Sequence, residues 1–306
     1  MCRQGLARGY YFSMDAHNTL VIDHDALKSH EALAHSWGGQ PSRITVAATC
    51  LNARGGFDYG TFRHDGYRPL LHRRDVFFVR GRYFIMTDAI TMDFAGLNTV
   101  FASEGDIRPH HYRQRLHFEP GVRAQRLSGR EGLDARAAGG PGVLIVPEPF
   151  ENLTIEEGPN GYLDGLKTKR FCGCRMADIT RRTMGACIFS TVYCPHDGRR
   201  APDLHVTPLT PKTTPFRDDR HHAILIEDGG HRDLWMVQRD LAQPRHVTIA
   251  ADGLRLETDA AVLFLSLRGG RVVQSFRAGG RRVRMNGTDL RVDASRLTWH
   301  KKECIP

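Results

Sequence analysis

Residues 74–90 read RDVFFVRGRYFIMTDAI, and this pattern predicts a β-hairpin. Two runs rich in Val, Phe and Ile, 74–79 and 83–90, flank Arg80-Gly81, a pair that fits a tight turn between adjacent strands. The aromatic and basic residues of this stretch could also suit an exposed surface on which nucleic-acid bases stack. Because the apolar residues are dense and continuous, we favour two core strands joined by a turn.

Short runs rich in Val, Ile, Phe and Thr, bounded by Gly, Pro, Asp or Asn, recur on both sides of this hairpin. They are residues 19–23, 44–50, 143–146, 186–192, 223–226, 234–238, 247–250, 261–267 and 272–276. Gly269-Gly270 and Gly279-Gly280 fit further tight hairpins between adjacent strands. One helical window stands out, 25–37, with apolar residues near one face. Evenly spaced strands without intervening helices predict an all-β fold, an antiparallel β-sandwich.

Two stretches interrupt the strand pattern. Residues 128–142 are polar and rich in Gly, and residues 195–221 carry five prolines, so we expect both to be exposed loops. Because strands resume after each loop, we treat 1–306 as a single β-sandwich region. Apolar residues make up 41% of the chain, which suffices for a packed core. No apolar run reaches about eighteen residues, so we expect no membrane insertion.

The charge of the chain is biased toward arginine. Lys and Arg together number 43 against 34 acidic residues, a formal net charge of +9, and only six of the 43 are Lys. One interpretation is a GC-rich coding sequence, whose codons favour Arg. The other is a partner with planar anionic groups such as carboxylate, sulfate or phosphate, which guanidinium binds in a bidentate manner. Net charge by itself does not distinguish nucleic acid from acidic polysaccharide.

Several catalytic and metal-binding patterns fail on their spacing. HEALAH at 30–35 places its second histidine five residues after the first, whereas a zinc protease needs four. The histidine pairs 110–111 and 221–222 would point to opposite faces of a strand, so we expect solvated loop histidines instead of metal ligands. Cys172 and Cys174 are too close for a CxxC metal or redox hairpin. The sequence has no GxSxG, Walker A or GxGxxG motif between a strand and a helix.

One segment is more specific. Ser13 to Asp23 reads SMDAHNTLVID and resembles the S-x-x-A-H-N-T segment that enters a C-terminal sandwich strand in the heparinase II/III-like polysaccharide lyases. Gly66-Tyr67 followed by HRRDVFF at 72–78 resembles the GY…HRR strand of the same family. Later strands and hairpins of the family are similar, in the same order, to residues 83–88, 116–121, 256–260 and 286–287. The AHNT segment is the distinctive one, and the others gain weight from their order.

The resemblance implies a fold and an activity. Members of this family join an N-terminal α/α toroid to β-sandwich sheets and cleave uronate-containing polysaccharides by β-elimination. The AHNT segment begins only sixteen residues from Met1, and the toroid and the H-x-H-x-D and D-P-G segments that precede AHNT in the family have no counterpart here. We therefore expect the C-terminal sandwich of such a lyase, with no catalytic residue carried over and no activity as an isolated chain. Whether the chain counts as an enzyme is left open.

The resemblance also implies site residues. His17 matches the AHNT histidine, which implies a ligand of a structural metal, zinc in the full-length context; a hydrogen-bonded core histidine is the alternative. Tyr10 and Tyr11 match an aromatic pair on the substrate side, which implies substrate binding. The implied partners are an acidic polysaccharide and an N-terminal toroid half. The family implies a periplasmic or secreted protein, whereas the lack of a visible signal peptide predicts a cytoplasmic one if Met1 is the true start.

Two alternatives to the lyase-derived function stay open. The first is a non-catalytic carbohydrate-binding β-sandwich, and the second, which we favour less, is a basic nucleic-acid-binding β protein. The arginine excess suits both, since each neutralises a polyanion. Preference among alginate, heparin and single-stranded DNA distinguishes them.

Overall fold

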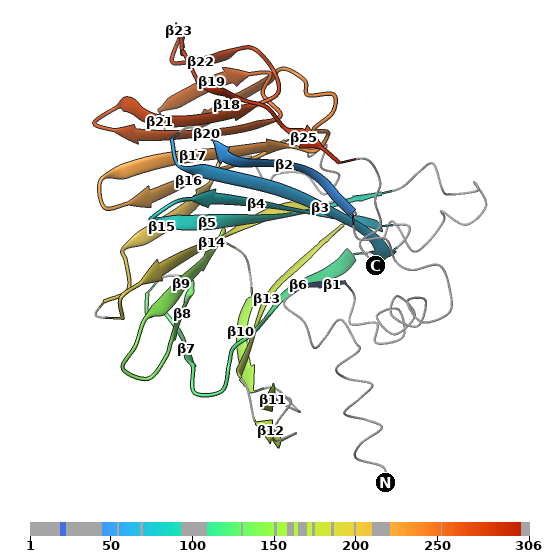
Figure 1. Ribbon diagram of the computed structural model, residues 1–306, viewed down its shortest axis with the longest axis vertical. Helices are drawn as coiled ribbons and strands as arrows, with labels where there is room; N and C mark the ends of the chain where they lie inside the picture. The colour runs from blue at the N-terminus through green and yellow to red at the C-terminus, as the bar shows by residue number, and fades with distance from the viewer. Residues whose placement is uncertain are drawn as a thin grey trace, which may run out of the picture.

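The computed structural model describes residues 19–22, 45–53, 55–67, 70–92, 109–129, 131–149, 152–157, 162–164, 170–172, 175–184, 187–198, 200–209, 221–251 and 253–300. Every regular element within these residues is a strand, and none is a helix (Figure 1). The prediction of an all-β, antiparallel sandwich is confirmed. The helical window expected at 25–37 lies outside the described residues. In the part of the chain that is described, no helix is long and apolar enough to cross a membrane.

The described strands form four larger sheets and one two-stranded ribbon. The nine-stranded sheet runs, in spatial order, β25 (Thr298–Trp299), β2 (Thr45–Ala53), β3 (Phe57–Tyr67), β4 (Leu70–Val79), β5 (Tyr83–Met92), β14 (Cys187–His196), β9 (Gly142–Pro147), β8 (Leu133–Arg136) and β7 (Arg123–Arg126). The six-stranded sheet runs β15 (Leu204–Pro208), β16 (His221–Asp228), β17 (His231–Gln238), β20 (Val262–Arg268), β21 (Arg271–Ala278) and β24 (Ala294–Ser295).

We name each of the two four-stranded sheets after one of its two central strands. The β6 sheet runs β1 (Leu20–Ile22), β6 (Pro109–His117), β13 (Arg175–Met184) and β10 (Asn152–Glu157). The β19 sheet runs β18 (Val247–Ala251), β19 (Leu254–Thr258), β22 (Val283–Met285) and β23 (Thr288–Asp289), and the ribbon pairs β11 (Tyr162–Asp164) with β12 (Arg170–Cys172). Neighbouring strands are antiparallel except β21 and β24, which are parallel.

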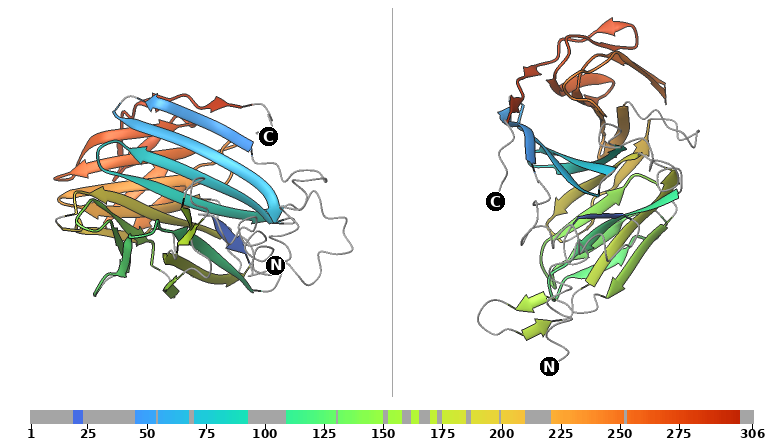
Figure 2. Two further views of the ribbon diagram at one scale, coloured as in Figure 1. Left: turned by 60° about the horizontal axis from the view of Figure 1, so that its bottom comes forward. Right: turned by 90° about the vertical axis from the view of Figure 1, so that its right-hand side faces the viewer.

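The four larger sheets stack as layers in the order β6 sheet, nine-stranded sheet, six-stranded sheet, β19 sheet (Figure 1 and Figure 2). Each contact between neighbouring layers has its own buried apolar side chains. Phe77 and Trp235 lie between the nine-stranded and six-stranded sheets. Leu234 and Leu256 lie between the six-stranded sheet and the β19 sheet, and Ile179 and Ile145 lie between the β6 sheet and the nine-stranded sheet. The described residues therefore form three interfaces between four layers, and the interface beneath the β6 sheet holds two separate apolar clusters.

Strands β16, β17 and β20 of the six-stranded sheet are covered on both faces, which explains why they are apolar without alternation. All of Asp233 to Gln238 in β17 is buried. Along that strand, Trp235 enters the core shared with the nine-stranded sheet, whereas Leu234 and Met236 enter the core shared with the β19 sheet. A strand that is buried on both faces reads as a continuous apolar run, because every side chain has a core to enter.

The hairpin predicted at 74–90 is confirmed as β4 and β5, joined by a turn at residues 80–82. Phe77 is fully buried and stacks on Trp235 of β17, with ring centroids 4.7 Å apart. The indole N–H of Trp235 donates a hydrogen bond to Thr87 Oγ1 at 3.0 Å. Because Tyr and Trp need a polar partner when buried, this bond fixes how the two large sheets face each other.

Two segments expected to be exposed loops contain strands. Residues 128–142 include β8, in which Leu133 and Ala135 alternate into the core beneath the β6 sheet. Residues 195–221 include the end of β14 and all of β15. The Gly and Pro residues of these segments mark the turns, but four or five residues between them are enough for an added strand.

The turn at Gly269-Gly270 joins β20 to β21 as predicted, whereas the hairpin predicted at Gly279-Gly280 is wrong. This pair carries the chain from β21 in the six-stranded sheet toward β22 in the β19 sheet, and these two strands are not paired. A Cβ on Gly280 would lie 2.3 Å from the backbone oxygen of Asp259. Glycine is needed there because the chain changes layer at a close approach and with positive φ.

Candidate functional site

The HRRD run of β4 divides between two layers, because side chains alternate along a strand. Arg73 and Asp75 face the six-stranded sheet, where Arg73 donates to the backbone oxygen of Gln238 at 2.9 Å and, through Nε, to Asp75 at 3.0 Å. His72 and Arg74 face the β6 sheet. The first pair joins the two large sheets, and the second pair enters a buried polar cluster.

Asp88 on β5 is the centre of that cluster and is fully buried. Its carboxylate accepts hydrogen bonds from His72 Nε2 at 2.7 Å and from Arg74, through Nε at 2.7 Å and a terminal nitrogen at 3.0 Å. Gln114, on β6 in the facing sheet, donates to the same carboxylate at 3.3 Å and accepts from the Thr191 hydroxyl at 2.7 Å. We name these five residues the Asp88 cluster.

The charge of Asp88 follows from its partners. Burial raises the pKa of this carboxyl group, but the Arg74 guanidinium and the His72 hydrogen bond lower it more, so the pKa lies well below its usual value. Burial likewise lowers the pKa of Arg74, and Asp88 raises it by more. The cluster therefore contains a buried ion pair whose two members each hold the other in its charged form.

His64 on β3 extends the cluster. Its Nε2 lies 2.8 Å from His72 Nδ1, and the two rings meet edge to face with centroids 4.7 Å apart. Burial, followed by the neighbouring His72 and Arg74, lowers the pKa of His64 to about 3. A general base is most effective when its pKa lies near the working pH. The Asp88–His72–His64 chain is therefore better suited to orient hydrogen bonds than to remove a proton at neutral pH.

The cluster lies beside the strand that follows the AHNT segment. Leu20, the first residue of β1, pairs with Gln114, and its backbone oxygen accepts a hydrogen bond from the Tyr67 hydroxyl at 2.7 Å. The backbone oxygen of Thr19, the last residue of AHNT, accepts one from the Arg115 N–H at 2.9 Å. Thr19 and Leu20, at the end of the AHNT segment, thus meet Tyr67 and the HRR strand, which are distant in sequence, between the β6 sheet and the nine-stranded sheet.

The residues to which the resemblance assigns roles precede Thr19 in the sequence. Tyr10, Tyr11 and His17 are outside the described residues, so their implied roles in substrate and zinc binding stay predictions. Within the residues that the structure does describe, no group of three or more His, Cys, Asp or Glu side chains could hold a metal ion.

The other face of the β6 sheet carries basic side chains. Arg115 forms a bidentate pair with Asp178 on β13, at 2.8 Å through Nε and 2.6 Å through a terminal nitrogen. Arg113 approaches the same carboxylate at 3.4 Å. The register places His111 opposite Arg182 on this face. Guanidinium groups aligned in this way are the type that recognises carboxylate and sulfate.

The two histidine pairs lie on strands, so the prediction of solvated loop histidines is wrong. In each pair one member is buried, His110 on β6 and His222 on β16, and its neighbour is more exposed. His222 Nε2 lies 3.0 Å from the fully buried Glu148. Adjacent strand residues do point to opposite faces. The inner face at His222 is a core that contains the Glu148 carboxylate.

Sequence patterns did not indicate His64, Gln114 or Thr191 as members of one site. They come from three different strands, and the pairing of β3 with β4, the pairing of β14 with β5 and the stacking of two sheets bring them together. The spacing of His72 and Arg74 was the one available signal, since residues two apart on a strand share a face.

The fold of this chain is similar to part of several solved structures. The chain is similar to the heparan sulfate lyase HepC from Pedobacter heparinus, with a TM-score of 0.54 and 15% identity over 78% of this chain and 33% of that one. A heparinase III gene product matches with a TM-score of 0.55 and 14% identity over 77% of this chain and 32% of that one. At these identities the likeness establishes the fold alone. The chain spans about a third of the length of both neighbours.

The sequence itself identifies the family. Residues 5–172, more than half of the chain, match the family described as heparinase II/III-like, C-terminal. The chain therefore belongs to the heparinase II/III-like C-terminal family, as its AHNT and HRR segments predicted. Among curated proteins, no sequence matches it. Every member of the Asp88 cluster except Thr191 lies within the matched residues.

Proposed function

We propose that this chain is the C-terminal β-sandwich of a polysaccharide lyase that cleaves acidic, uronate-containing polysaccharides by β-elimination. The observation that carries the proposal is that Thr19 and Leu20, at the end of the AHNT segment, meet Tyr67 and the HRR strand beside the Asp88 cluster, within the residues that match the family. The structural neighbours, a heparan sulfate lyase and a heparinase III, support the same substrate class.

The chemistry of β-elimination limits what the described residues contribute. The uronate carboxylate is neutralised, a base removes the C5 proton, and an acid protonates the departing O4. His64, with a pKa of about 3, is poorly suited to be that base at neutral pH. We therefore assign the Asp88 cluster a positioning role: it holds β1, and with it the AHNT segment, against the nine-stranded sheet.

The basic face of the β6 sheet supports a role in attracting the polymer. Arg113, Arg115 and Arg182 lie on the same face of paired strands. Arg113 and Arg115 are buried against Asp178, so the exposed Arg182 is the one of the three that can attract a polyanion. We propose that an N-terminal toroid half supplies the base and the acid, and that the isolated chain does not cleave. The zinc role of His17 and the substrate role of Tyr10 and Tyr11 belong to that assembled state.

A lyase assay tests this proposal. The chain alone, and the chain fused behind the toroid of a heparinase II/III-like lyase, are incubated with heparan sulfate, heparin and alginate. Each cleavage creates an unsaturated uronate, whose ultraviolet absorbance is followed. We expect no increase with the chain alone, and an increase with the fusion that exceeds that of the toroid alone. Cleavage by the isolated chain would contradict the proposed inactivity, and a folded but inactive fusion would contradict the lyase function.

A further inference from the structure

A groove of about 910 Å³ lies at the edge of the two large sheets, outside the residues that match the family and away from the Asp88 cluster. Three segments form it: the loop after β17, the Gly279-Gly280 crossover, and residues 294–299, which contain β24 and β25. We name it the C-terminal groove. Neither the AHNT resemblance nor the lyase proposal gives it a role.

The segment 294–299 is held firmly across two sheets. β24 pairs with β21 at one edge of the six-stranded sheet, and β25 pairs with β2 at one edge of the nine-stranded sheet. Between them Leu297 is buried in the central core. Beyond β25, the His300 N–H donates to the backbone oxygen of Ala47 at 3.2 Å. The side chains of this segment therefore stand on a fixed backbone, which reduces the entropic cost of binding a ligand.

Trp299 and Arg296 are the two side chains of the groove best able to bind a ligand. The indole of Trp299 is 49% exposed, although large aromatic side chains are normally covered. Arg296 is exposed and forms no ion pair with any residue that the structure describes. Trp and Arg are enriched where proteins bind tightly. An indole face packs against the apolar face of a sugar ring, and a guanidinium binds carboxylate or sulfate.

The charge of the groove and its surroundings favours an anion. None of the described residues that line the groove is acidic, and Arg296 is the charged one. Residues 253–300 contain nine arginines and four acidic residues. Two of those acids are already engaged, Glu257 with Arg255 and Asp289 with Arg282. The part of the chain around the groove is therefore positive on balance, which favours an anionic ligand.

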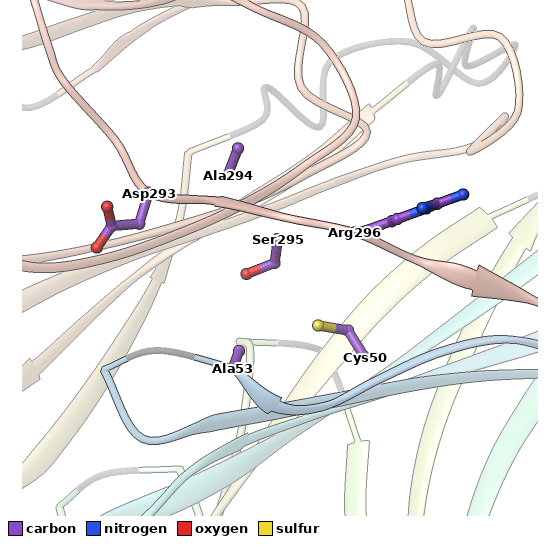
Figure 3. A pocket seen from close by; sticks show the side chains of 6 residues that line it. All are labelled: Cys50, Ala53, Asp293, Ala294, Ser295 and Arg296. Carbon is purple, nitrogen blue, oxygen red and sulfur yellow. The ribbon is translucent and has the colours of Figure 1, made fainter.

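A smaller hollow of about 230 Å³ adjoins the groove and shares its residues 294–296. Figure 3 shows Cys50 and Ser295 pointing toward each other in this hollow, and Arg296 extending away from them. Burial raises the pKa of the Cys50 thiol more than its hydrogen bond with Ser295 lowers it, so this side chain is uncharged at neutral pH. Asp293 lines the hollow, which disfavours an anion there and limits the anionic site to the Trp299 side.

We propose that the C-terminal groove binds an anionic polysaccharide at a site separate from the place of cleavage. A sugar ring stacks on Trp299, and a carboxylate or sulfate of the polymer pairs with Arg296. Gly279 and Gly280 line the groove opposite this segment. A site of this kind would keep the protein on its polymer between cleavage events.

Binding by the complete chain tests the proposal, with heparan sulfate and alginate oligosaccharides as probes and single-stranded DNA of matched length as the rival polyanion. We expect Trp299→Ala and Arg296→Gln each to weaken binding of one oligosaccharide about tenfold. Trp299→Phe and Arg296→Lys should retain part of the affinity. Arg271→Gln is the matched control, because it removes one exposed arginine at the opposite end of β21, and we expect it to change affinity less than about twofold.

Intrinsic fluorescence gives an independent readout. Trp235 is fully buried and Trp299 is half-exposed, so stacking of a sugar should shift the emission of the wild type and not that of Trp299→Ala. Equal losses in Arg296→Gln and Arg271→Gln, or equal affinity for all three polymers with a steep salt dependence, would overturn the proposal in favour of plain electrostatics. Tighter binding of DNA would overturn it in favour of a nucleic-acid site. Because these measurements need no cleavage, their outcome is separate from that of the lyase assay.

Discussion

His72 Nε2 lies 2.7 Å from Asp88 Oδ1, and the two side chains are 3% and 0% exposed. Arg74 stands directly opposite Asp88 in the register of β4 and β5, and His72 stands diagonally, two residues away. The H-x-R spacing thus brings two donors to one carboxylate from a single strand. Gln114 of the facing sheet donates a further hydrogen bond to the other oxygen of Asp88, Oδ2. This one carboxylate therefore links two layers of the fold.

Asp88→Asn should strongly destabilise the protein. The amide keeps the shape of the side chain but leaves the Arg74 guanidinium, whose side chain is 17% exposed, without its charged partner. Removing one member of a buried ion pair typically costs about 3–5 kcal/mol. Urea unfolding measures the loss. Asp58→Asn is the matched control, because its pair with Arg80 is exposed to solvent and should contribute much less to stability. Equal losses in both variants would mean that the cluster contributes no more than a surface pair.

The low pKa of His64 predicts a specific pH dependence. This side chain has a pKa of about 3 in the folded protein and about 6.5 when unfolded, so the unfolded chain binds the additional proton between these values. Stability should therefore fall as the pH is lowered from 6.5 toward 3, with a contribution of up to about 1.4 kcal/mol per pH unit. Asp88 adds to the loss only below about pH 4, where its unfolded form takes up a proton.

His64→Gln isolates this effect, since glutamine can keep a hydrogen bond to His72 but does not titrate. Urea unfolding at several pH values between 7 and 4.5 should show a smaller slope for the variant than for the wild type. His205→Gln serves as the control, because His205 is 54% exposed and should leave the slope unchanged. A wild-type slope that persists in His64→Gln would assign the proton uptake to another histidine.

Consecutive residues of β4 should respond very differently to truncation. Phe77 is fully buried against Trp235, whereas Phe78 on the opposite face is 39% exposed. Phe77→Ala leaves a cavity between the two large sheets and should cost about 3–5 kcal/mol, and Phe78→Ala should cost clearly less. Thermal or urea unfolding of both variants measures the contrast. Comparable losses would show that an additional layer covers Phe78 in solution.

The sequence predicted this hairpin because local alternation and turn residues define it, but it did not predict four layers. Phe77 and Phe78 are both apolar, and no local pattern tells which face of β4 receives the six-stranded sheet. The continuous apolar runs of β17 and β20 indicated burial on both faces. The identity of the covering sheets depends on contacts between strands that are far apart in sequence.

The sequence likewise predicts only part of the candidate site. The HRR and AHNT motifs indicate two strands of one family fold, and the structure places those strands, β4 and β1, on either side of the Asp88 cluster. Asp88 ends the strand motif at 83–88, yet its role depends on Gln114 and Thr191, which come from β6 and β14. Residues that meet only through sheet stacking carry no shared local signal. The C-terminal groove was missed for the same reason.

The pairs Gly269-Gly270 and Gly279-Gly280 differ in how strictly they require glycine. Gly269 and Gly280 both have positive φ, 56° and 63°. A Cβ at Gly269 would meet nothing within 4 Å, whereas one at Gly280 would lie 2.3 Å from the Asp259 backbone oxygen and 2.5 Å from its carboxylate. Gly269→Ala should therefore cost about 1 kcal/mol for the left-handed backbone alone.

Gly280→Ala should cost more than about 2 kcal/mol, because it adds a steric conflict to the same backbone strain. The conflict also displaces the Asp259 carboxylate, which accepts hydrogen bonds from the N–H groups of Arg281 and Arg282 at 2.7 Å each. Those two bonds fix the crossover between the six-stranded sheet and the β19 sheet, so the last layer should loosen first. Hydrogen exchange, read alongside thermal unfolding, should show faster exchange in β22 of Gly280→Ala than in Gly269→Ala. Indistinguishable stabilities for the two variants would mean that the crossover relaxes freely and that the two pairs are equivalent turns.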